Sequence, residues 1–219
     1  MSYEQIYFDG TGTLLMFSLG VAKYLKENYT IKKVTTVSGG GIAGVALLTL
    51  APYEFDNVAE QIASIFAPLH RNPLANVWVG GKFRQVLELL VTRSSLPLLR
   101  GKLQIATTVL PTRRRKLYTE PFATVEEVIS DLQTSAYIPF YFLRPPYLHH
   151  WLEVDGGASK TFYHASTTLV VGAGYSPEAD VYLTKEILDS RRFRSYEEQM
   201  ALYQDGYDRA RQMLKTVKF

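Results

Sequence analysis

Two successive units of strand, glycine-rich turn and helix open the chain, and they constrain its fold more than any other feature. In each unit a run rich in β-branched or aromatic residues ends in a glycine turn, and an apolar helical segment follows. The first unit covers residues 3–8, 9–12 and 16–27, and the second covers residues 31–37, 39–41 and 42–50. Such units in succession are typical of a mostly parallel sheet with helices on both faces. We therefore predict an α/β fold.

The rest of the chain continues the mixed pattern. Further helices are predicted over residues 52–66, 83–92, 124–133 and 196–214, and further strands over residues 102–110, 151–154 and 167–171. Residues 68–81 hold two prolines and end in a Gly-Gly pair, which predicts a loop. The chain has 219 residues, no internal repeat and no convincing linker. That length suits one sizeable core, so we expect a single domain over residues 1–219.

Composition excludes several functional classes. There is no cysteine, and hence no disulfide, no thiol nucleophile and no cysteine-based metal site. The net charge is only +3, which indicates no nucleic-acid partner. The most apolar stretch, residues 39–50, is shorter than the roughly 20 residues that span a bilayer, and the N-terminus carries no signal-peptide pattern. We expect a cytoplasmic protein without a transmembrane segment that associates peripherally with membranes.

The positive charge gathers in two clusters, residues 113–116 and residues 191–194. Such clusters usually lie on solvated loops, and contact with anionic lipid is the alternative. Aromatic residues make up 13% of the chain, and some of them, Trp78 included, fall in predicted loops. Aromatic side chains beside basic ones suit a surface that dips into lipid headgroups, although an ordinary core explains most of them equally well.

Ser38 lies where a predicted strand meets a predicted helix, within the segment Thr-Thr-Val-Ser-Gly-Gly-Gly over residues 35–41. A serine there raises its hydroxyl at the carboxyl end of the sheet, and the glycines after it let the backbone turn sharply. The nucleophile-elbow pattern is Gly-x-Ser-x-Gly; here its second glycine is Gly40, and Thr36 replaces the first. A glycine-rich cap of a buried helix, or an anion site at its N-terminus, is the alternative.

The turn at residues 9–12, Asp-Gly-Thr-Gly, could supply backbone N–H groups to a reaction. Acyl transfer needs such donors aimed at the oxyanion that forms during attack. A dinucleotide-binding turn is the rival interpretation, but Leu15 stands where its third glycine is required, and no acidic residue closes the second strand. No Walker lysine follows either. We therefore favour an oxyanion turn over a nucleotide site.

Asp155 ends a short predicted strand and is followed by Gly156 and Gly157. An aspartate in this position can accept the proton of a serine hydroxyl directly and act as the general base. Taken alone, the triplet is an ordinary turn signal, so its meaning depends on the other motifs.

The histidines offer weaker alternatives. A triad of Ser38, Asp155 and His164 would follow the order of α/β-hydrolases. However, His164 lies only 164 − 155 = 9 residues after the aspartate, which leaves little chain to bring it back over the serine. His149 and His150 form a pair that more often faces solvent than binds a metal.

In their order along the chain, these motifs resemble the patatin-like phospholipase family. They are Gly10-Thr11-Gly12, Gly20-Val21, Ser38-Gly39-Gly40 and Asp155-Gly156-Gly157. Residues 101–108, 135–139 and 144–146 are similar to the segments that precede the family's Asp-Gly-Gly, and residues 170–180 and 203–210 look closest to the branch of adipose triglyceride lipase and adiponutrin. The resemblance covers nearly the whole chain and is weakest between residues 52 and 99.

This resemblance implies a three-layer fold and an acyl-enzyme mechanism that uses a Ser-Asp dyad, without metal or cofactor. The site residues that it implies are the nucleophile Ser38, its base Asp155, the oxyanion-hole residues Gly10, Thr11 and Gly12, and the elbow and loop glycines Gly39, Gly40, Gly156 and Gly157. The implied substrate is a phospholipid or an acylglycerol at a membrane or droplet surface.

Two departures from the family pattern bear on activity. Thr36 could crowd the elbow, and residues 159–163 lack the usual asparagine and proline after the Asp-Gly-Gly motif. A catalytically silent relative that binds lipid or regulates a partner is therefore the alternative function.

Overall fold

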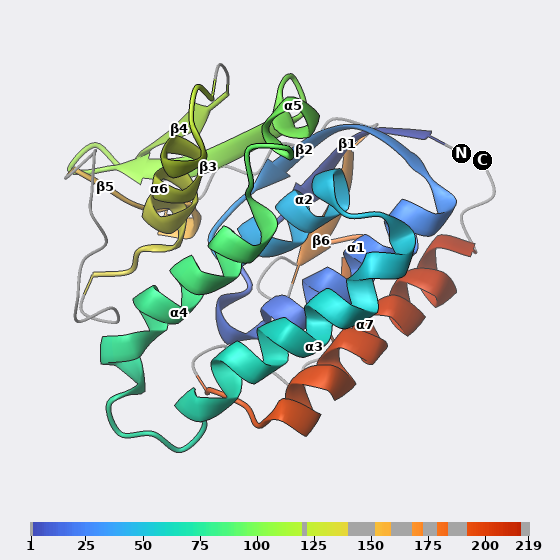
Figure 1. The fold of residues 1–219 in the computed structure, drawn as a ribbon. Helices are drawn as coiled ribbons and strands as arrows, with labels where there is room; N and C mark the ends of the chain where they lie inside the picture. The colour runs from blue at the N-terminus through green and yellow to red at the C-terminus, as the bar shows by residue number, and fades with distance from the viewer. Residues whose placement is uncertain are drawn as a thin grey trace.

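A mostly parallel sheet of seven strands forms the centre of the described part of the molecule (Figure 1). The structure is a computed structural model that describes residues 2–119, 122–139, 152–158, 168–172, 179–183 and 192–215. The strands are β1 (Ser2–Phe8), β2 (Thr30–Thr36), β3 (Leu103–Val109), β4 (Arg114–Tyr118), β5 (Glu153–Asp155), β6 (Thr168–Gly172) and β7 (Val181–Tyr182). Their order is β4-β3-β2-β1-β6-β7, with β5 and β4 antiparallel to β3 and the other pairs parallel. The predicted α/β class is confirmed.

Helices fill most of the remaining described chain. They are α1 (Leu15–Asn28), α2 (Gly40–Thr49), α3 (Phe55–Phe66), α4 (Ala75–Leu90), α5 (Leu96–Leu99), α6 (Val125–Ala136) and α7 (Tyr196–Lys215). Short 3-10 turns are η1 (Gly12–Leu14), η2 (Pro52–Glu54), η3 (Ala67–Leu69) and η4 (Gly156–Ala158). Helix α6 begins where its sequence indicated, because the Thr124 hydroxyl accepts the Glu127 N–H and caps the first turn.

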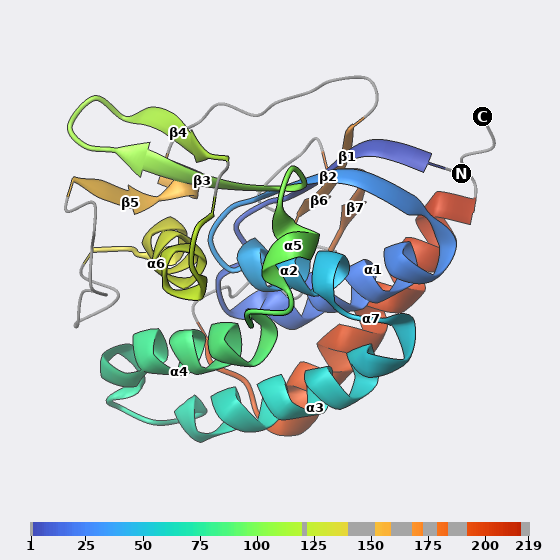
Figure 2. The same cartoon turned by 45° about the horizontal axis from the view of Figure 1, so that its top comes forward.

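The described helices pack against one face of the sheet, in two tiers (Figures 1 and 2). The chain passes from β1 to β2 to β3 in one direction across the sheet, so right-handed crossovers put α1 and the helices after β2 on the same side. Helices α1 and α2 lie next to the strands, and α3 and α4 lie outside them (Figure 2). A helix layer on the second face would have to come from segments outside the described residues.

Alternating residues of β1 separate the two faces of the sheet. Ile6 and Phe8 point into the main core with the helices, whereas Tyr7 belongs to a smaller cluster on the second face. Helix α2 is buried between the sheet and the outer helices, as its continuously apolar sequence predicted. This helix starts at Gly40, two residues after Ser38, and so anchors that residue in the core.

The prediction of a loop over residues 68–81 is wrong in its second half, because α4 already begins at Ala75. Its buried residues recur at helical spacing, from Ala75 and Val79 to Phe83 and beyond, so the apolar face packs on the core. That burial outweighs the low helix propensity of Gly80 and Gly81, which costs about 1 kcal/mol for each glycine.

Helices α1 and α7 approach each other through two glycines. A Cβ atom added to Gly20 would lie 1.9 Å from the carbonyl oxygen of Tyr203, and one added to Gly206 would lie 2.0 Å from that of Phe17. Nothing larger than hydrogen fits at either position. The terminal helix is therefore locked onto the first helix, and Tyr24 packs edge-on against Tyr207 beside the crossing.

Substituting either crossing glycine by alanine should push the two helices apart. We expect Gly20→Ala and Gly206→Ala each to lower the free energy of unfolding by about 1–3 kcal/mol, as overpacking usually does. Urea unfolding followed by circular dichroism measures this. Gly81→Ala is the matched control, since no atom lies within 4 Å of its added Cβ, and it should stabilise α4 by about 0.5–1 kcal/mol. A crossing variant as stable as the wild type would contradict this packing.

Candidate active site

The register of the sheet brings three distant segments to one level. Thr36 on β2 pairs with Ile105 on β3, so Ser38 lies level with Thr107, two residues further on. Thr107 in turn pairs with Asp155 on the antiparallel strand β5. The turn after β1 lies beside them, because a Cβ added to Gly10 would lie 3.5 Å from the Cβ of Ser38. The predicted site residues therefore come together at the carboxyl ends of β1 and β2.

Ser38 has a left-handed backbone, with φ of 52°, which is uncommon for a residue that carries a side chain. Hydrogen bonds on either side hold it there. The Val37 N–H donates to the carbonyl oxygen of Phe8 at 3.0 Å, and the Ser38 N–H donates to the Ser135 hydroxyl at 3.0 Å. Non-glycine residues in this conformation cost of order 1–3 kcal/mol and cluster at functional sites.

Gly39 and Gly40 are required because the serine turn packs directly against the turn after β1. A Cβ on Gly39 would lie 2.7 Å from the Thr11 hydroxyl oxygen and 2.8 Å from the carbonyl oxygen of Gly12. A Cβ on Gly40 would lie 2.6 Å from the carbonyl oxygen of Asp9. Any side chain at these positions would push the two turns apart.

The Thr36 side chain does not crowd the elbow, because a glycine in helix α2 leaves room for it. Its side chain is buried, and its Cγ2 occupies the volume that a Cβ on Gly44 would need, 2.2 Å from that position. Its hydroxyl donates to the carbonyl oxygen of Gln104 at 3.3 Å. The glycine missing from the elbow pattern is therefore offset by a glycine eight residues later.

Asp155 is buried, and its two carboxyl oxygens differ in their surroundings. Oδ1 accepts the Gly157 N–H at 2.7 Å, whereas Oδ2 is buried and has no hydrogen-bond partner in the described part of the chain. The pKa of Asp155 is raised to about 6. Burial and the charge of Asp9 raise it, and the Ser38 hydroxyl and the Gly157 N–H partly offset them.

The loop glycine Gly156 packs closely against the backbone of a neighbouring strand. A Cβ on Gly156 would lie 2.3 Å from the carbonyl oxygen of Ala106. The backbone after Asp155 therefore presses against β3, which holds the carboxyl group over the sheet.

Sequence reasoning missed two supporting residues. Ser135, in the last turn of α6, donates to the carbonyl oxygen of Ala106 at 2.6 Å while it accepts the Ser38 N–H. Asp9 accepts the Gly10 N–H on its Oδ1 at 2.8 Å, and burial raises the pKa of Asp9. The sequence pattern shows Ser135 only as part of a family-like segment and Asp9 only as a turn residue. Neither pattern indicates which backbone groups these two side chains contact.

The Asp9 contact changes which N–H groups are free to face a substrate. The Gly10 N–H is engaged by Asp9. The N–H groups of Thr11, Gly12 and Gly39 donate to no acceptor among the residues that the structure describes. The residue after a nucleophilic serine commonly supplies one oxyanion donor.

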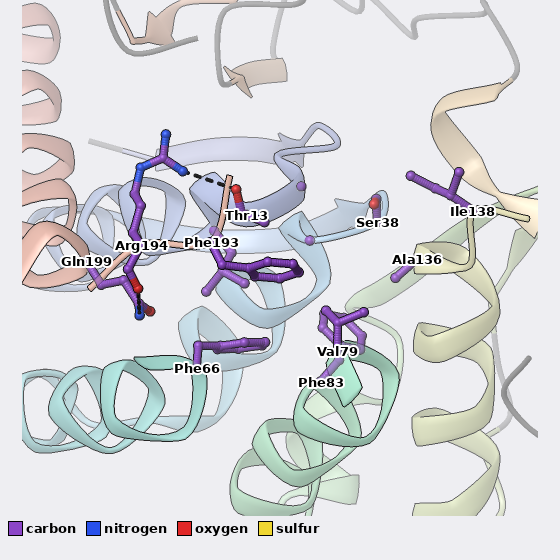
Figure 3. A pocket seen from close by; sticks show the side chains of 13 residues that line it. Thr13, Ser38, Phe66, Val79, Phe83, Ala136, Ile138, Phe193, Arg194 and Gln199 are labelled. Atoms are coloured by element: carbon purple, nitrogen blue, oxygen red, sulfur yellow. Dashed lines mark hydrogen bonds between the residues drawn. The ribbon is translucent and has the colours of Figure 1, made fainter. Parts of the chain in front are cut away.

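An apolar pocket adjoins Ser38 (Figure 3). It holds about 590 Å³ of empty space, part of which is open to solvent. Gly12, Ser38 and Gly39 line one part of it. The apolar wall consists of Leu15, Phe66, Val79, Phe83, Ala136, Ile138 and Phe193. Figure 3 shows Ser38 and Ile138 at one side and Arg194 and Gln199 at the other.

Of the four histidines, the structure describes His70 alone. His149, His150 and His164 lie outside the described residues, and so do residues 159–163. His70 bonds through Nδ1 with the carbonyl oxygen of Phe193 at 3.0 Å and does not line the pocket. Among the described residues, no group of three or more histidine, cysteine or acidic side chains could hold a metal. No described helix combines the length and the apolar character needed to cross a bilayer.

The pairing of Thr36 with Gly44 makes a testable prediction. Gly44→Ala should lower the free energy of unfolding by about 1–3 kcal/mol, because its methyl group would overlap the Thr36 Cγ2. In the double variant with Thr36→Gly that space is free again, so the two changes should cost less together than their sum. A double-mutant cycle measured by urea unfolding reports the coupling, and strictly additive effects would contradict it.

Comparison with known proteins agrees with this geometry. The family model described as patatin-like phospholipase matches residues 6–167. The crystal structure of VipD from Legionella pneumophila is similar to the chain with a TM-score of 0.57 and 10% sequence identity, covering 98% of this chain and 67% of that one. No curated protein sequence matches it. Because the family model spans most of the chain and includes the motifs at Gly10, Gly20, Ser38 and Asp155, the protein belongs to the patatin-like phospholipase family.

Proposed function

We propose that the protein is a serine lipid acyl hydrolase that cleaves carboxylic esters of phospholipids or acylglycerols through a Ser38–Asp155 dyad. The observation that carries the proposal is a strained serine next to a buried carboxyl group, at one end of an apolar pocket. Membership of the patatin-like family supports lipid acyl hydrolysis as the reaction class. A pocket lined mainly by apolar side chains suits an acyl chain better than a polar substrate.

In the proposed reaction, Asp155 removes the proton of Ser38 as the serine oxygen attacks the acyl carbonyl carbon. The unpartnered Oδ2 of Asp155 is the oxygen available for that proton. The alcohol or lysolipid leaves, and water activated by the same carboxylate then hydrolyses the acyl-serine. A base with a pKa near 6 is ionised at neutral pH yet more basic than an ordinary aspartate.

The oxyanion would be stabilised by N–H groups of Gly12 and Gly39, both of which line the pocket beside Ser38. Thr11 is a third candidate donor. Gly10 takes a different role in this proposal, because its N–H is engaged by Asp9. It keeps the turn close to the serine, and Asp9 keeps the turn in place.

We further propose that residues 1–219 form one hydrolase domain of the adipose triglyceride lipase and adiponutrin branch. Residues 203–207, which resemble this branch, pack directly on the family motif at Gly20. The inactive alternative loses the support of Thr36, since Gly44 accommodates that side chain.

Ser38→Ala should abolish hydrolysis of a soluble ester such as p-nitrophenyl butyrate, and Asp155→Asn should lower kcat/KM by about 10²–10⁴-fold. In the wild type, kcat/KM should fall below a pH of about 6, because protonated Asp155 cannot act as a base. An activity that is insensitive to Asp155→Asn would contradict the proposed dyad. A fluorophosphonate that labels wild type but not Ser38→Ala would support Ser38 as the nucleophile.

The stability of Asp155→Asn separates catalysis from folding. The pKa of Asp155 in the folded protein, about 6, lies above its ordinary value of 3.8. Stability from this group is therefore complete below about pH 4 and is lost as the pH rises to about 6. Asparagine avoids the buried charge, so the variant should be at least as stable as wild type at pH 7. Thermal unfolding at pH 4 and pH 7 tests this.

Asp9→Asn should move the acid limb of the pH profile to lower pH. The charge of Asp9 raises the pKa of Asp155, and an amide in its place keeps an acceptor for the Gly10 N–H without that charge. Asp131→Asn is the control, since the raised pKa of that buried carboxyl group, about 7, arises from burial and from Glu127 and Glu153, away from the serine. A limb that moves with Asp131 instead would contradict the assignment of the base.

A further inference from the structure

The elements that lie at the left side of Figures 1 and 2, where β3 ends, carry exposed apolar side chains. They come from the start of α4, the end of α6, the turn between β3 and β4, and the residue before β5. They are Leu74, Trp78, Ile138, Leu110 and Leu152, with exposed fractions of 57%, 50%, 42%, 37% and 43%. A hydrogen bond of 2.7 Å from the Leu110 N–H to the carbonyl oxygen of Leu152 joins two of these segments.

Three of these residues adjoin the pocket that contains Ser38. Ile138 is both exposed and part of the pocket wall. Trp78 directly precedes Val79, another wall residue, and Leu74 lies one helical turn before Trp78. Leu74, Trp78 and Ile138 therefore form an apolar rim beside the pocket.

Exposed basic side chains lie on two of the same segments. Arg113 is exposed in the turn between β3 and β4, Arg114 is exposed at the first residue of β4, and Arg71 is exposed in the turn before α4. None of the three forms an ion pair with an acidic side chain in the described ranges. Arg71 and Arg113 also have left-handed backbones, with φ of 56° and 53°, so each lies in a tight turn. Free positive charge beside exposed apolar groups complements an anionic lipid surface.

We propose that this docking face, formed by Leu74, Trp78, Ile138, Leu110 and Leu152 with Arg71, Arg113 and Arg114, binds the surface of an anionic phospholipid bilayer. The inference rests on the proposed function and names where the substrate is met. Trp78 and Leu74 enter the interface between headgroups and acyl chains, and the arginines contact headgroup phosphates. The pocket then opens toward the lipid, so an ester can reach Ser38 without crossing water.

Binding is tested with Ser38→Ala protein, so that no lipid is hydrolysed, by co-sedimentation with vesicles of phosphatidylcholine containing about 30% phosphatidylglycerol. Leu74→Ser with Trp78→Ser should weaken binding by about tenfold or more. Arg113→Ala with Arg114→Ala should weaken it by about 30-fold, and vesicles of phosphatidylcholine alone should bind poorly. Tyr53→Ser is the matched control, because Tyr53 is 83% exposed and belongs to η2, which leads into the right-hand end of α3 in Figure 1, away from the start of α4.

Contact is tested directly by the fluorescence of Trp78. The chain has two tryptophans, so Trp151→Phe leaves Trp78 as the sole reporter. Its emission should shift to the blue on vesicle addition, and lipids brominated on the upper acyl chain should quench it. Sedimentation with vesicles but no quenching would overturn the proposal, because another surface would then be in contact. Binding that ignores lipid charge and both arginines would overturn it too.

Activity separates this inference from the proposed function. The Leu74→Ser, Trp78→Ser variant with Ser38 intact should keep its kcat/KM on soluble p-nitrophenyl butyrate and lose about tenfold or more on vesicles. Equal losses on both substrates would overturn the docking role, since the residues would then serve the pocket itself. If wild type hydrolyses no ester, the proposed function fails, while the binding and quenching results still decide the docking face.

Discussion

The close approach of two turns underlies the rest of the structure. The elbow at Ser38 and the turn after β1 touch through Gly39 and Gly40, where a single methyl group would overlap backbone atoms. Hydrogen bonds to Phe8 and Ser135 then hold the serine in a conformation that its side chain disfavours. Helix α2 is buried along its length between the sheet and the outer helices, and the free energy of this burial offsets the cost of the strained serine. An ordinary apolar core thus supports the strained backbone of the candidate nucleophile Ser38.

The same packing sets the electrostatics of the candidate site. Asp155 is held over β3 by the loop glycine Gly156, in a position where burial opposes its ionisation. Such burial reduces stability at neutral pH but yields a carboxylate of raised basicity, which the proposed mechanism uses. Asp9 contributes at both levels, because it orders the turn after β1 and its charge reinforces the raised pKa of Asp155. At Asp155, the burial that the proposed mechanism uses therefore lowers stability at neutral pH. At Gly39 and Gly40, the same close packing serves both stability and the arrangement of the candidate site.

Much of the fold could be predicted because it depends on local pattern. The run of β-branched residues before Ser38 and the apolar helix after it each match their element in the structure, and the Thr124 cap marked the start of α6. The failure at α4 is equally instructive. Gly80 and Gly81 indicated a loop, but the periodic burial of Val79 and Phe83 outweighed two weak helix formers. Propensity is a matter of about 1 kcal/mol for each residue, and core burial exceeds it.

By itself, the sequence determined which chemical groups are present and which short turns they occupy: a serine and an aspartate, each followed by glycines, and a glycine turn after the first strand. Only the tertiary structure decided how these groups meet. The antiparallel pairing of β5 with β3 brings Asp155 level with Ser38, and no local pattern encodes that register. The pairing of Thr36 with Gly44, the engagement of the Gly10 N–H and the apolar pocket likewise depend on contacts between segments far apart in the chain. Local propensities act over a few residues, whereas an active site is a product of long-range packing.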